Sequence, residues 1–70
     1  MANQIQVTAN GQPYPIVEGA SIPDFLKQLN LIQQNVVIEL NQKALTQKEA
    51  NKIILTQNDS LEIIKIVAGG

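Results

Sequence analysis

The sequence contains no cysteine, histidine, tryptophan or arginine. Without cysteine a disulfide framework is impossible, and without cysteine and histidine so is a zinc site of the usual kind. A Ser–His or Cys–His nucleophile cannot be assembled, and the commonest general acid–base residue is missing. We therefore expect a protein with no catalytic residue, metal or cofactor of its own, and not an enzyme. The lack of cysteine also fits a cytoplasmic protein.

Charge and long apolar runs are scarce as well. Five lysines are scattered along the chain against six acidic residues, for a net charge of −1. A nucleic-acid-binding surface needs clustered cations that track phosphates, so we expect no nucleic-acid partner. Apolar runs never exceed three residues, which predicts no membrane span. A chain of 70 residues has room for one core and hence one domain.

The first half of the chain predicts a hairpin followed by a helix. Residues 4–9 alternate apolar and polar, as a half-buried strand does, and Asn10-Gly11 is a strong two-residue hairpin signal. Residues 12–17 form the return strand, and its two prolines place it at a sheet edge. Ser21 and Asp24 predict a capped helix over 22–30. We expect Leu31 and Ile32 to cap the core below that helix.

The second half predicts strands around a second, shorter helix. Residues 36–40 are rich in β-branched side chains, 43–45 form a short partner strand, and 46–51 carry a possible capping box. Residues 60–67 form the last strand, in which Leu61, Ile63, Lys65 and Val67 share one face. The expected core is one cluster: Ile5, Val7, Ile16, Phe25, Leu26, Leu29, Ile38, Leu61 and Ile63.

This order of elements predicts an α+β fold. The helix crosses over between strands, so the last strand should lie beside the first and parallel to it. That is the β-grasp, or ubiquitin-like, arrangement: a mixed sheet of four to five strands with one main helix packed on one face. We expect residues 1–67 to form this domain and residues 68–70 to be a flexible tail.

The C-terminal Gly69-Gly70 pair is the notable chemical feature of the chain. Glycine has no Cβ and alanine has only a methyl group, so the backbone of Ala68, Gly69 and Gly70 can thread a narrow channel in a partner enzyme. The Gly70 carboxylate is then open to activation by ATP. In the last strand, Ile64 and Ile66 face away from the predicted core. Two exposed apolar residues beside a reactive tail indicate a docking patch for that partner.

The chain resembles the ThiS family of sulfur-carrier proteins of thiamine biosynthesis over essentially its whole length. The resemblance rests on the early Asn-Gly hairpin, Gly-Ala-Ser before the helix, Val-Val-Ile-Glu-Leu-Asn, Leu-Thr-Gln-Asn-Asp-Ser-Leu-Glu-Ile-Ile and the final Val-Ala-Gly-Gly. It implies that a ThiF-type adenylating enzyme, using ATP and magnesium, activates Gly70. Sulfur that a cysteine desulfurase takes from cysteine would turn the adenylate into a thiocarboxylate. Thiazole synthase would then accept the sulfur.

Two alternatives stay open from the sequence. The small subunit of molybdopterin synthase shares the fold, the Gly-Gly end and the thiocarboxylate chemistry, although it tends to be longer. A ubiquitin-like module that binds partners without carrying sulfur would make the terminal glycines incidental.

Overall fold

The computed structural model describes residues 3–66, and its five strands form one mixed sheet. These are β1 (Gln4–Ala9), β2 (Gln12–Val17), β3 (Val36–Leu40), β4 (Lys43–Leu45) and β5 (Ser60–Lys65). The order across the sheet is β2-β1-β5-β3-β4, with β5 parallel to β1 and antiparallel to β3. The predicted α+β, β-grasp arrangement is therefore confirmed.

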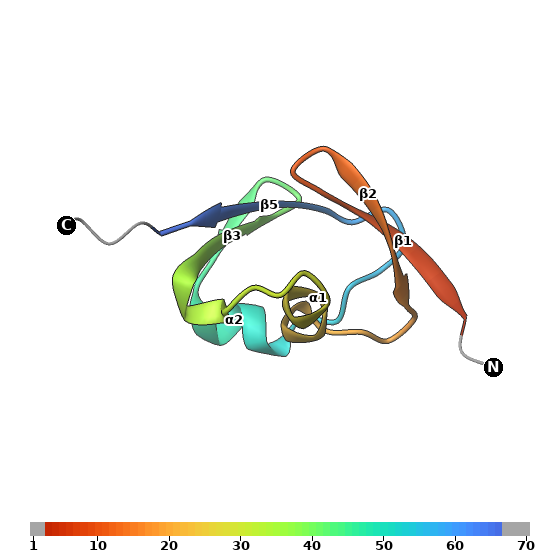
Figure 1. Ribbon diagram of the computed structural model, residues 1–70, viewed down its shortest axis with the longest axis horizontal. Coiled ribbons are helices and arrows are strands. Elements are labelled where there is room, and N and C mark those ends of the chain that lie inside the picture. Colours follow the sequence, from red (N-terminus) through yellow and green to blue (C-terminus); the bar gives the residue numbers. More distant parts are fainter. Residues whose placement is uncertain (1–2, 67–70) are drawn as a thin grey trace.

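Two helices and a short 3-10 turn complete the fold. They are α1 (Ile22–Gln28), η1 (Gln33–Asn35) and α2 (Gln47–Lys52). Figure 1 shows both helices on the same side of the sheet, with β5 running across the other side of the core. Within residues 3–66, the helices therefore cover one face of the sheet, and the opposite face carries no helix.

The hairpin between β1 and β2 forms where the Asn10-Gly11 signal predicts it. Asn10 has φ 51° and Gly11 has φ 80°, the two positive values of a type I′ turn, whose twist matches that of the flanking strands. Pro13 and Pro15 lie opposite Thr8 and Gln6. Because β2 is an edge strand, no neighbour on its outer side requires the N–H groups that the prolines lack.

Both helices begin at capping boxes. The Asp24 N–H donates to Ser21 Oγ at 3.2 Å, and the Ser21 N–H donates to Asp24 Oδ2 at 3.1 Å. Thr46 and Glu49 make the same exchange at the start of α2. The helix α1 ends two residues earlier than predicted, since Asn30 has φ 59° and this left-handed conformation cannot continue a helix.

A single core fills the space between the sheet and the helices. Of the nine predicted core residues, seven are buried, whereas Ile5 and Leu29 are partly buried at its margin. The core also contains Ala9, Ile22, Val36, Ala50 and Leu55. The expectation that Ile32 caps this core is wrong, because its side chain is 61% exposed. Ile32 is extended (φ −97°, ψ 124°), so neighbouring side chains diverge and only Leu31 packs against the core.

Candidate functional site

The strand β5 leads to the C-terminus and is held on both sides. Its backbone pairs with β1 through Leu61 and with β3 from Leu61 to Lys65. Beyond Lys65, the Ile66 N–H still donates to the Asn35 carbonyl at 2.8 Å. Val67, Ala68, Gly69 and Gly70 lie outside the described residues, and so does the predicted inward position of Val67. The described part of the chain therefore ends on the central strand of the sheet.

Asn10 extends the pairing of β5 beyond the end of β1. Its Oδ1 accepts from the Ile63 N–H at 2.7 Å, and its Nδ2 donates to the Ile63 carbonyl at 3.0 Å. The Asn10 backbone N–H also donates to the Leu61 carbonyl at 2.9 Å. The amide side chain thus replaces one peptide group of the strand that turns away at Gly11. Sequence reasoning assigned Asn10 to the hairpin alone and missed this role.

Asn41, in the turn between β3 and β4, holds the other end of β5. Its Oδ1 accepts from the Ser60 N–H at 2.9 Å, and its backbone N–H donates to the Ser60 carbonyl at 2.7 Å. Asn41 Nδ2 donates to Asp59 Oδ1 at 3.1 Å, while Asp59 Oδ2 accepts from the Thr56 N–H at 2.8 Å. Asp59 therefore fixes the turn before β5.

Of the two isoleucines that the alternation places outward, Ile64 lies on the outer face of β5 and Ile66 follows one residue after the strand. Ile64 and Ile66 are each 55% exposed. Ile63, the neighbour that precedes Ile64, points to the core and is 8% exposed. Val37 of β3 lies directly opposite Ile64 and is 41% exposed. The sequence prediction named only the isoleucines. The alternation of residues 36–40 identifies Val37 as outward-facing, but its contact with Ile64 needs the sheet register.

The acidic side chains of the two capping boxes stabilise the starts of the helices. The backbone N–H of Ser21, and then its hydroxyl, hold the pKa of Asp24 below its ordinary value. Thr46 does the same for the pKa of Glu49. Within residues 3–66, no three histidine, cysteine, aspartate or glutamate side chains gather as metal ligands. No helix in that range is long and apolar enough to cross a membrane.

Comparison with known proteins gives one family. Residues 7–70 match the model of the ThiS family. Relatives called "Uncharacterized protein ycf40" occur in Porphyra purpurea, 30% identical over 66 residues that cover 94% of this chain and 93% of the relative, and in Trieres chinensis, 33% identical over 61 residues that cover 87% and 84%. A crystal structure of the thiamine biosynthesis protein (ThiS) from Geobacter metallireducens superposes with a TM-score of 0.73. The two sequences are 27% identical, and the superposition covers 94% of this chain and 100% of the Geobacter chain.

Proposed function

This chain belongs to the ThiS family, and from that premise we propose that it carries sulfur on Gly70 for thiazole formation in thiamine biosynthesis. The observation that carries the proposal is the extent of the family match, which runs from residue 7 through the terminal Gly69-Gly70. In sequence, the tail directly follows the central strand β5. In this proposal the folded domain is therefore the part that partner enzymes bind, and the last residues are the part that reacts.

The proposed chemistry uses the Gly70 carboxylate and no side chain of this protein. A carboxylate oxygen attacks the α-phosphorus of ATP in a ThiF-type enzyme, pyrophosphate leaves, and an acyl-adenylate forms. The terminal sulfur of a persulfide, loaded by a cysteine desulfurase, then attacks the acyl carbon, and AMP leaves. A second thiol cleaves the resulting acyl disulfide, which yields the thiocarboxylate and an ordinary disulfide. ATP and magnesium belong to the partner.

The tail and the outer face of β5 have separate tasks in this proposal. Ala68, Gly69 and Gly70 enter the partner's active site, where residues with little or no side chain fit a narrow channel. Ile64 and Ile66 dock against the partner's surface, because a short tail alone offers little contact area and loses entropy when ordered. Thiazole synthase binds the same end when it accepts the sulfur.

The test is an ATP–pyrophosphate exchange assay with the ThiF-type enzyme, followed by intact-mass measurement after addition of cysteine and a desulfurase. The full chain should support exchange and should gain the mass difference between sulfur and oxygen. A chain lacking Gly70 should do neither, yet melt at the same temperature, because an end residue contributes little packing. Exchange by the shortened chain would refute the assignment of Gly70.

The acceptor enzyme distinguishes the thiamine pathway from the molybdopterin alternative. The ThiS family match and the thiamine biosynthesis protein among the structural relatives favour thiazole synthase over the large subunit of molybdopterin synthase. Offering the thiocarboxylate form to each enzyme, and measuring which one converts it back to the carboxylate, distinguishes the pathways. A pure interaction module would bind partners without ever gaining sulfur.

A further inference from the structure

The outer face of the sheet joins an apolar surface to a pair of like charges. Val37 and Ile64 lie opposite each other, and the next outward pair towards the start of β5 is Glu39 opposite Glu62. Ile66, exposed and one residue beyond β5, follows towards the C-terminus, and the alternation of the strand assigns it to the same side. We call these five residues of β3, β5 and the chain after it the outer β3–β5 face. It combines three exposed apolar side chains with two facing carboxylates.

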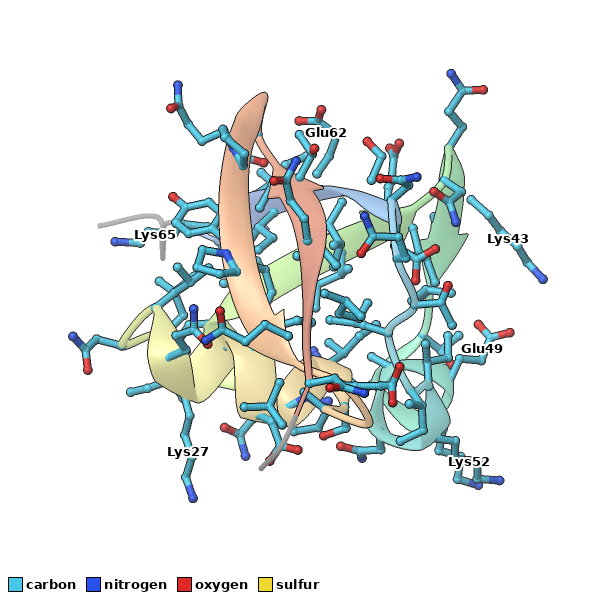
Figure 2. All side chains as sticks on the ribbon, turned by 90° about the vertical axis from the view of Figure 1, so that its right-hand side faces the viewer. Lys27, Lys43, Glu49, Lys52, Glu62 and Lys65 are labelled. Carbon is cyan, nitrogen blue, oxygen red and sulfur yellow. The ribbon has the colours of Figure 1, made fainter. Side chains whose placement is uncertain are left out.

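No cation of the described chain shares this face. Of the five lysines, Lys27 lies on α1, and Lys48 and Lys52 lie on α2, all on the covered side of the sheet. Lys43 pairs with Leu40, and Lys65 pairs with Val36, so both occupy inward positions of their strands. Figure 2 shows Glu62 at the top of the molecule and Lys27 at the opposite, lower end.

The facing glutamates work against the sheet. Like charges placed directly opposite each other on neighbouring strands destabilise the pairing. On its other side, Glu39 lies opposite Ala44 of β4, which has no charge to offset the repulsion. A local feature that opposes folding, within an otherwise consistent fold, points to a functional surface. What is missing is a positive group between the two carboxylates.

We propose that the outer β3–β5 face docks a protein surface that places a cationic side chain, best an arginine, between Glu39 and Glu62 and an apolar patch over Val37, Ile64 and Ile66. This inference rests on the proposed function, since it names the chemistry of the enzyme surface that receives the tail. The planar guanidinium suits the role because it can donate to two carboxylates at once. A second copy of this chain is a poor occupant, because a symmetric contact brings four carboxylates together.

The test compares the double variant E39Q/E62Q with E18Q. Glutamine keeps the size of glutamate and removes its charge, and Glu18 is an exposed glutamate just after the edge strand β2. Titration calorimetry against the ThiF-type enzyme should show binding by the double variant weakened about tenfold at low salt. That loss should shrink as salt is raised, because screening weakens the charge contact in the wild type. E18Q should bind as the wild type does.

Stability measurements make the result unambiguous. The urea midpoint of E39Q/E62Q should equal or exceed that of the wild type, because the variant removes a repulsion and leaves the packing intact. Wild-type binding by the double variant, or a loss no larger than that of E18Q, would overturn the inference. So would a wild-type dimer in size-exclusion chromatography that the double variant strengthens.

The inference and the proposed function fail differently. If the full chain supports pyrophosphate exchange and E39Q/E62Q binds normally, the carrier function stands and the cationic contact is wrong. If the full chain neither binds the ThiF-type enzyme nor supports exchange, both are wrong.

Discussion

Replacing Asn10 by glycine should lower the free energy of unfolding by about 2 kcal/mol, since it removes two hydrogen bonds that each contribute about 0.5–1.5 kcal/mol net. Glycine keeps the left-handed turn conformation, in which Asn10 has φ 51°, so the hairpin itself is not strained. What is lost is the pair of hydrogen bonds, at 2.7 and 3.0 Å, between the Asn10 side chain and the Ile63 backbone. We call this pair the clamp on β5. Asn10 is exposed, so water can reach the Ile63 groups that lose their partners, and the full cost of burying unpaired groups does not apply.

Asn58→Gly is the matched control for this prediction. Asn58 is also left-handed, with φ 71°, but its side chain only accepts from its neighbour Gln57 at 3.2 Å. Urea unfolding followed by circular dichroism should show the 2 kcal/mol loss for Asn10→Gly, with an unchanged slope, and little change for Asn58→Gly. In a domain of this size the loss corresponds to a melting temperature lower by about 10 °C. Equal losses in the two variants would refute the clamp.

Three further predictions concern packing, face and pH. Ile63→Ala should cost about 2–5 kcal/mol in urea unfolding, and the half-buried Leu29→Ala should cost less; the reverse order would contradict the burial. Circular dichroism should find Ile63→Glu unfolded, because it buries an unpaired charge, and Ile64→Glu folded, with weaker binding to the adenylating enzyme or thiazole synthase; an unfolded Ile64→Glu would be inconsistent with an outward side chain. Asp24 and Glu49 have pKa values lowered from 3.8 and 4.5, so they stabilise the fold above those values, and this contribution is lost as pH falls through the lower folded-state pKa; the D24N/E49Q variant should show a flatter acid unfolding curve than the wild type.

Local signals in the sequence determined the elements and their faces. Asn10-Gly11 predicted its hairpin because the residues that tolerate positive φ are few. Ser21 predicted the start of α1 because a cap acts on groups three residues away. The alternation along β5 separated Ile63 from Ile64, since side chains of a strand point alternately to its two faces. The Gly69-Gly70 end was visible for the same reason, as a feature of adjacent residues. Each of these depends only on close neighbours in the chain.

Contacts between distant residues were decided by the tertiary structure. The hydrogen bonds of Asn10 to Ile63 span 53 positions, and no local pattern marks an asparagine that will serve two strands. Leu55 joined the core from a stretch whose short apolar run predicts no particular face. The length of α1 also depended on the left-handed Asn30, because side-chain type permits that conformation without requiring it.

The same division applies to the candidate docking surface. The sequence by itself placed Ile64 on the outer face and predicted that it contacts a partner enzyme. Only the register of β3 against β5 set Val37 opposite Ile64 and Glu39 opposite Glu62. A shift of one residue in that pairing would have moved every side chain of the strand to the other face. Register is a property of two segments packed on a common core, so a strand read alone determines which of its residues are exposed but not which residues they meet.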